Sequence, residues 1–210
     1  MEPDPQQTVP GITIRLATRH DIAAMMALEA HHYVGNLDAS ERTDGFISVL
    51  HPQDWFNWAV NCAGIHVAVV DSAISDSADA GSTVADDGGV AGFIAITPPP
   101  TDLAADASPI IGTILGLAET LEFRGRPLAQ QRWALRGPVL IDRPARGRGL
   151  YSAFNAVTRE AYRERYDVGV LFVAAGNPRS LHTTTTKLAA QPLAVFEVGA
   201  DQYHLLAFSF

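Results

Sequence analysis

The chain has 210 residues, of which 47% are hydrophobic and 18% are charged, and its formal net charge is −8. A chain of this length and apolar content suits one domain with a single buried core. Its acidic balance gives no support to a nucleic-acid-binding surface, which would require clustered Lys and Arg. The lone cysteine, Cys62, excludes an intrachain disulfide and a zinc site built on cysteine ligands.

The first ten residues are polar and include three prolines, which predicts a disordered tail at 1–10 ahead of a single domain at 11–210. The tail has neither the basic region nor the apolar region of a secretion signal. No apolar run reaches the length of about 18 residues that a membrane helix needs. The sequence therefore predicts a soluble, cytoplasmic protein without a membrane partner.

The N-terminal half combines strand and helix signals. Apolar residues alternate between Gly11 and Leu16, which predicts a strand. Thr18 and Asp21 have the spacing of a capping box, and a helical stripe follows as far as about His31. The next predicted elements are a helix at 52–61 and strands at 65–70 and 90–96.

Between these two strands lies an acidic segment, residues 71–89, which contains five Asp and no basic residue. Such a segment cannot bury enough apolar surface to offset the entropy of ordering it. We therefore expect a mobile loop inserted into a hairpin of the same domain.

The C-terminal half predicts a strand–helix–strand crossover. The strand at 132–141 is interrupted by Gly137-Pro138, which indicates a bulge or a splay. An amphipathic helix from Leu150 to about Ala161 leads to a strand at 168–174, and such a crossover is right-handed and parallel. The remaining predicted elements are a helix at 110–121, a helix opened by Asn177-Pro178, and closing strands at 193–198 and 203–210. This order predicts an α/β (α+β) domain with a mixed sheet of about seven strands and helices on both faces.

The residues that carry chemistry lie where the strand at 132–141 meets the following helix. The loop Arg146-Gly147-Arg148-Gly149 leads directly into that helix, whose N-terminus offers unpaired N–H groups and a positive partial charge. Glycine lets the backbone approach a phosphate, and the arginines add positive charge. The loop therefore predicts an anion site suited to a pyrophosphate. Its sequence matches neither a Walker loop nor a dinucleotide-binding fingerprint.

The segment from Arg146 to Tyr151 resembles the Arg/Gln-x-x-Gly-x-Gly/Ala signature of the GNAT superfamily of N-acetyltransferases. The strand at 139–142 before it, and Asn177–Ser180 with Lys187-Leu188 after it, are similar to further motifs of that family. The resemblance covers residues 11–210 apart from the segments 71–89 and 97–131. It implies the GNAT fold and acetyl-CoA as the acyl donor.

The resemblance also implies how acetyl-CoA is bound. Backbone groups of Val139 and Ile141 would pair with the pantetheine arm as an added strand. N–H groups of the loop and the first helical turn would hold the pyrophosphate, and Asn177 would contact the pantetheine near the thiol. The full set of implied cofactor contacts is Val139, Leu140, Ile141, Arg146, Gly147, Arg148, Gly149, Leu150, Tyr151, Asn177 and Ser180.

The sequence departs from the family pattern at several positions that concern catalysis. Tyr151 stands where the family prefers Gly or Ala. The family often places a Tyr, as acid for the leaving thiolate, in the helix after Asn177, whereas this chain has Thr184 near that position. The strand before the loop contains no Glu, so Glu119 and Glu122 are the candidate bases for the acceptor amine.

We therefore expect an N-acetyltransferase in which a primary amine of a small molecule or peptide attacks acetyl-CoA directly. A transferase for a longer acyl-CoA and a non-catalytic coenzyme A sensor are the alternatives, and a homodimer is compatible with the sequence. No metal site is expected, because His31 and His32 are neighbours at a solvated helix end and adjacent helix positions face apart.

Overall fold

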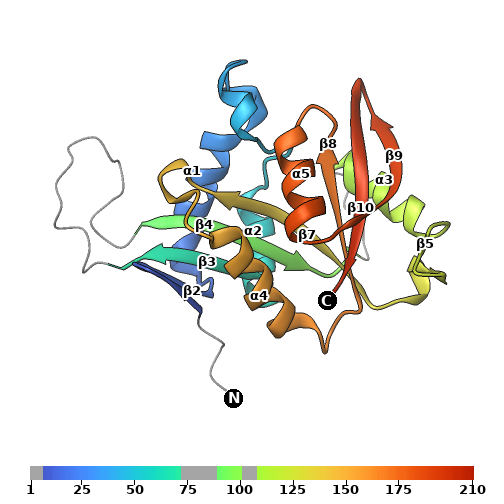
Figure 1. Cartoon of the computed structure of the whole chain (residues 1–210), viewed down its shortest axis with the longest axis horizontal. Helices are drawn as coiled ribbons and strands as arrows, with labels where there is room; N and C mark the ends of the chain where they lie inside the picture. Colours follow the sequence, from blue (N-terminus) through green and yellow to red (C-terminus); the bar gives the residue numbers. More distant parts are fainter. Residues whose placement is uncertain (1–6, 72–88, 101–107) are drawn as a thin grey trace.

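A computed structural model describes residues 7–71, 89–100 and 108–210 of the chain, and its centre is one eight-stranded sheet (Figure 1). The strand order is β1-β2-β3-β4-β7-β8-β10-β9, in which β7 and β8 are parallel and the other neighbours are antiparallel. These strands are β1 (Gln7–Val9), β2 (Ile12–Leu16), β3 (Ile65–Val70), β4 (Val90–Thr97), β7 (Trp133–Ile141), β8 (Val168–Ala174), β9 (Gln191–Val198) and β10 (Asp201–Ser209). The mixed sheet confirms the predicted fold class and the parallel crossover.

Helices cover both faces of the sheet, as predicted. The helices are α1 (Ile22–His32), α2 (Gln53–Asn61), α3 (Pro109–Ala118), α4 (Leu150–Tyr162) and α5 (Pro178–Lys187). α1 and α2 lie behind the sheet in Figure 1, and α4 and α5 lie in front of it. Apolar side chains of these helices contribute to the core: Phe56 of α2 packs on Phe93 of β4, and Phe154 of α4 is fully buried on the other face. None of the helices in the described ranges is long and apolar enough to cross a lipid bilayer.

Two segments differ from the sequence prediction. Residues 7–9, expected in a disordered tail, instead pair with β2 as the edge strand β1. The prediction of a disordered tail at 1–10 is therefore wrong for residues 7–9. Residues 122–131, for which no regular element is predicted between the helix at 110–121 and the strand at 132–141, contain a small hairpin of β5 (Glu122–Phe123) and β6 (Arg126–Pro127). Residues 1–6 and 72–88 lie outside the described ranges, and they include most of the predicted tail and acidic loop.

The predicted capping box lies at the 3-10 turn Arg19–Asp21 that leads into α1. The Asp21 carboxylate accepts from the Thr18 backbone N–H at 2.7 Å and from the two terminal nitrogens of Arg15 at 2.8 Å each. Asp21 is only 7% exposed, so these bonds lie in a partly desolvated environment. Burial raises the pKa of Asp21, but the hydrogen bonds from Arg15 and Thr18 outweigh it and lower the pKa below its usual value.

Asp21→Asn is therefore expected to lower the free energy of unfolding by about 2 kcal/mol, because a charge-assisted network is lost. The native carboxylate's contribution is present above the unfolded pKa of about 3.9 and is lost as the pH falls through the lower folded pKa. Urea unfolding at pH 7 and at pH 3 measures both effects. Glu164→Gln, at an exposed carboxylate after α4, is the control. An unchanged unfolding midpoint at pH 7 in Asp21→Asn would contradict the expectation.

The functional geometry begins where the two central strands separate. β7 pairs with β8 only over Trp133–Leu135, although β7 continues to Ile141 along β4. The separation begins immediately before Gly137-Pro138, which confirms the predicted splay. One edge of the second half of β7 is consequently unpaired within the sheet.

Candidate active site

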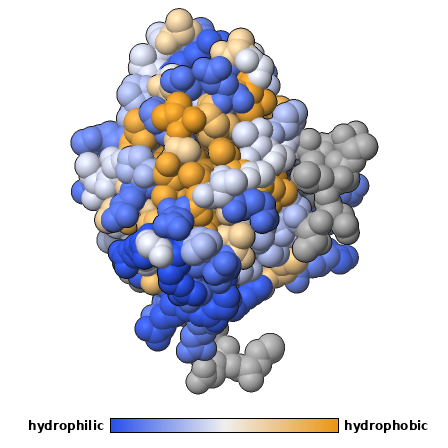
Figure 2. Space-filling view, turned by 90° about the vertical axis from the view of Figure 1, so that its right-hand side faces the viewer, coloured by the Kyte–Doolittle hydropathy of each residue, from blue (hydrophilic) through white to orange (hydrophobic). Residues whose placement is uncertain are grey.

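A cleft of about 1140 Å³ lies at this splay. This volume exceeds the roughly 300–1,000 Å³ of a pocket for one drug-sized ligand, so the cleft has room for two reactants. We call it the acyl cleft; its lining comes from β7, β8 and β10, from α5, from residues 46–52 ahead of α2, and from the start of α3. Apolar residues gather in the middle of the face on which α3 and β9 lie (Figure 2). Ile110 and Ile111 of α3 are among the cleft lining.

The unpaired edge of β7 carries the backbone groups that would bind pantetheine according to the resemblance to the GNAT signature. The Asp142 N–H donates to the Ala91 carbonyl of the β4 side at 2.9 Å. Because backbone direction alternates along a strand, Leu140 also faces β4, whereas Val139 and Ile141 face the splay. Leu140 is 5% exposed and packs in the core with α1, so its role is structural.

The predicted pyrophosphate loop is open at the start of α4. Gly147 and Gly149 have φ angles of 77° and 87°, in the left-handed region that favours glycine. An added Cβ at either position would meet nothing within 4 Å, so the space in front of the loop is free. Gly149 caps α4 and has no side chain to bond the first N–H groups, while Leu150 anchors the helix in the core at 1% exposure. A free helix N-terminus of this kind suits an anion.

The two loop arginines are held by backbone carbonyls of the protein itself. Arg146 donates through Nε to the Ile141 carbonyl at 3.0 Å and through Nη1 to the Asp44 carbonyl at 2.9 Å. Arg148 donates to the Pro10 carbonyl. The side chains therefore shape the loop, and carbonyl acceptors leave their positive charge uncompensated. Burial lowers the pKa of Arg146, and repulsion from Arg179 adds to this effect.

Asn177 is the N-cap of α5, as predicted. Its Oδ1 accepts from the Ser180 N–H at 3.1 Å, and its Nδ2 donates to the Phe46 carbonyl at 2.9 Å. Asn177, Ser180 and Thr184 all line the acyl cleft. Both ends of the Asn177 amide are thus engaged, and the residue holds the loop of Phe46 against α5 beside the predicted thiol position.

Comparison with solved structures places the chain among acetyltransferase folds. The sequence matches no protein-family model and no curated protein. An acetyltransferase of the GNAT family from Streptococcus agalactiae superposes with a TM-score of 0.60 at 13% identity, covering 97% of this chain and 98% of that one. The NatC complex bound to Gag peptide and CoA superposes with a TM-score of 0.57 at 12% identity, covering 95% of this chain and 98% of that one. The structure of yncA from Salmonella typhimurium with its cofactor acetyl-CoA superposes with a TM-score of 0.51 at 13% identity, covering 95% of this chain and 94% of that one. The chain has the GNAT fold. The resemblance predicted from the loop and from Asn177 is thereby confirmed for the fold.

The side chain of Tyr151 lies in the acyl cleft, a position that the sequence did not predict. Tyr151, at the position that usually holds Gly or Ala, is in the first turn of α4, and its side chain lines the acyl cleft. Its hydroxyl lies 3.5 Å from Oγ1 of Thr184, which is 3% exposed. A phenol therefore stands beside Thr184 in the wall of the acyl cleft.

Arg136 was not identified from the sequence, although it interrupts an otherwise apolar strand. It is 6% exposed, lines the acyl cleft and has its guanidinium carbon 5.2 Å from the Tyr151 ring centroid. Nη2 donates to Asn155 Oδ1 at 2.8 Å, and no carboxylate of the described residues pairs with the guanidinium. Nε is buried and has no hydrogen-bond partner among these residues. Burial lowers the pKa of Arg136, and the adjacent Tyr151 partly opposes this effect.

The two predicted bases are misplaced. Glu119 and Glu122 are exposed, and neither lines the acyl cleft. Glu119 is the C-cap residue at the end of α3, and Glu122 lies in the β5–β6 hairpin, whose turn residues Arg124 and Gly125 have positive φ. The acidic candidates are therefore carried on the surface of the connection before β7.

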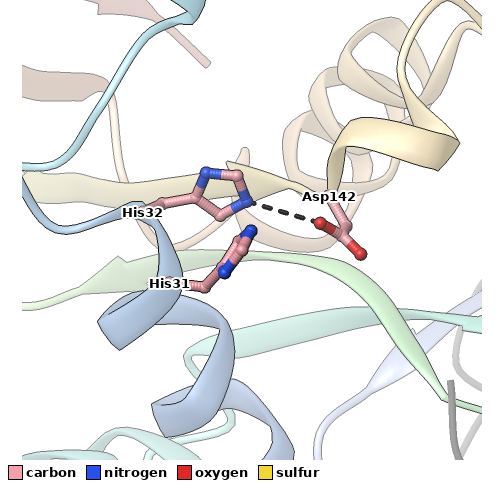
Figure 3. A group of neighbouring side chains, drawn as sticks. All are labelled: His31, His32 and Asp142. Atoms are coloured by element: carbon pink, nitrogen blue, oxygen red, sulfur yellow. Dashed lines mark ion pairs between the residues drawn. The ribbon is translucent and has the colours of Figure 1, made fainter. Parts of the chain in front are cut away.

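His31, His32 and Asp142 form a group beside the loop (Figure 3). The two imidazoles meet edge to face with centroids 5.0 Å apart, so the expectation that they point apart is wrong; the rings bend toward each other at the last turn of α1. His32 Nε2 lies 3.5 Å from Asp142 Oδ1, and Nδ1 lies 3.4 Å from Arg146 Nη2.

The contacts of His32 favour a structural link over a metal ligand. A guanidinium only donates, so Arg146 requires a lone pair on Nδ1 and leaves the ring proton on Nε2, facing Asp142. A metal ion at Nε2 would require the ring proton to move to Nδ1, where it would face the Arg146 guanidinium. The nearby His32 imidazole lowers the pKa of Asp142, whose carboxylate accepts a hydrogen bond from the Arg143 N–H at 2.8 Å. The group thus ties α1 to the start of the loop.

Proposed function

We propose that the chain is an acetyl-CoA-dependent N-acetyltransferase of the GNAT superfamily that acetylates a primary amine of a small molecule or peptide. The observation that carries the proposal is the alignment of the unpaired β7 edge with the open N-terminus of α4. An extended pantetheine can add to that edge as a strand would, and its pyrophosphate then reaches the glycine loop.

The cofactor end of the site has a charge that suits coenzyme A. The whole chain is acidic, yet the loop region gathers Arg143, Arg146, Arg148 and Arg179. Arg143 and Arg179 face Glu41 and Asp44 at 3.4 and 2.8 Å across exposed contacts, which only partly offset the positive field. The positive region supports phosphate binding by the loop N–H groups of 147–151.

The thiolate leaving group explains the role that we assign to Tyr151 and to the buried guanidinium of Arg136. When the amine nitrogen attacks the thioester carbonyl, the C–N bond forms, the C–S bond breaks and the sulfur departs with the electron pair. Tyr151 can protonate this thiolate, because a phenol is a far stronger acid than the Thr184 hydroxyl. Arg136, which lacks a carboxylate partner in the described chain, stabilises the negative charge in a site of low dielectric.

Calorimetric titration with acetyl-CoA, followed by thiol release in the presence of an amine panel, tests the function. The panel contains alkylamines, arylamines and short peptides with a free α-amine. Saturable binding and amine-dependent thiol release are expected. Absence of binding heat at several temperatures would reject the cofactor, and binding without thiol release would favour a coenzyme A sensor. Faster thiol release from a longer acyl-CoA would show that the enzyme transfers a longer acyl group than acetyl.

A further inference from the structure

Glu29 and His51 form a hydrogen-bonded pair at the wall of the acyl cleft. The Glu29 Oε1 lies 2.7 Å from Nδ1 of His51, and Oε2 accepts from the His51 backbone N–H at 2.9 Å. Glu29 is only 1% exposed and lies on the buried side of α1, in line with Met25 and His32. A carboxylate so deeply buried requires partners, and both of its oxygens are satisfied by one residue.

The second ring nitrogen of His51, Nε2, has no hydrogen-bond partner among the described residues. A carboxylate only accepts hydrogen bonds, so Nδ1 carries the ring proton and Nε2 has the lone pair. The imidazole lines the acyl cleft, and its side chain is 20% exposed. Its ring lies 4.0 Å from the Trp55 ring, centroid to centroid, so the indole packs against the imidazole. An imidazole with this tautomer and a fixed orientation is suited to accept a proton.

The other titratable groups of the cleft wall suit this task less well. Asp201 is exposed at the start of β10 and solvated. Burial, aided by the charge of Asp201, raises the pKa of Tyr203, so its phenol keeps its proton at neutral pH. Tyr151 and Arg136 belong to the thiolate end of the same cleft.

We propose that His51 is the general base for the acceptor amine and that Glu29 is its positioning residue. The inference rests on the proposed N-acetyltransferase function. As the amine nitrogen bonds to the thioester carbon, Nε2 of His51 takes a proton from nitrogen, and the thiolate takes a proton from Tyr151. Glu29 fixes the tautomer and stabilises the imidazolium that forms. The aromatic neighbours Tyr33, Trp55 and Trp58 line the cleft on this side, so the amine is expected to carry an apolar body.

His51→Gln is expected to lower kcat for amine-dependent thiol release about 100-fold, with the acetyl-CoA dissociation constant unchanged. Added imidazole should restore part of the rate in His51→Ala, where the missing ring leaves space. Glu29→Gln should lower kcat less, and nitrogen-15 spectra should show a loss of the Nδ1–H tautomer that we infer for the wild type. His20→Gln, at an exposed histidine before α1, is the matched control and should keep full activity.

The outcomes separate this inference from the proposed function. Wild-type turnover that persists unchanged in His51→Gln would overturn the base assignment and leave the acetyltransferase proposal standing. A loss confined to Asp201→Asn would likewise transfer the role to that carboxylate. Wild-type protein that binds acetyl-CoA but releases no thiol with any amine would overturn both. If His51→Gln does not fold, an Nε2–H tautomer in the wild-type spectrum is sufficient to reject the base.

Discussion

Arg136→Met is expected to slow thiol release at least 100-fold while the free energy of unfolding stays the same or rises. The guanidinium is buried, its Nε has no partner among the described residues, and no carboxylate there neutralises it. Burying such a cation costs several kcal/mol, and replacing it by an apolar side chain of similar length removes that cost. The presence of Arg136 despite this cost is explained if an anion forms beside it, and the thiolate is such an anion in the proposed reaction.

Single-turnover thiol release and urea unfolding of the same Arg136→Met preparation provide the measurement. Arg163→Met, at an exposed arginine near the end of α4 that pairs with Glu160, is the control and should retain full activity. A large loss of stability in Arg136→Met would show instead that its bond to Asn155 and its stacking on Tyr151 support the fold. Unimpaired thiol release would remove the cation from the mechanism.

Features governed by local sequence could be predicted for this chain. The alternation of β2, the capping box of α1 and the break at Gly137-Pro138 depend on residues within a few positions of one another. The loop before α4 was also predictable, because glycines, arginines and a helix start occur together in one short run. These features account for the position of the splay in β7 and of the glycine loop ahead of α4.

Contacts between distant segments could not be predicted in the same way. Glu29 and His51 are separated by 22 positions and meet only because the chain between α1 and α2 returns to the sheet. Glu29 could have been noticed as a carboxylate on the apolar stripe of a helix, which is costly unless it is paired. The hairpin that carries Glu122 outward depends on a left-handed Arg124, a conformation that residue type does not indicate.

Gly149→Ala is expected to weaken acetyl-CoA binding at least tenfold. The φ of 87° at this position costs an L-residue about 1–2 kcal/mol, and the added methyl group enters the open space in front of α4. If the pyrophosphate lies in that space, the methyl group prevents the close approach of the backbone N–H groups, each of which is worth about 1.5–3 kcal/mol to an anion. Calorimetric titration with acetyl-CoA measures the change.

Gly125→Ala separates the loss of binding from backbone strain. Gly125 has a φ of 73° and equally open surroundings, but it lies in the β5–β6 hairpin away from the loop. Both variants should lose similar stability, and only Gly149→Ala should lose acetyl-CoA affinity. Pantetheine, which has no pyrophosphate, should bind Gly149→Ala and the wild type equally. Equal acetyl-CoA affinity in the two variants, or an equal loss of pantetheine binding, would mean that the glycine loop does not hold the phosphates. The cleft would then need another anchor for its thioester.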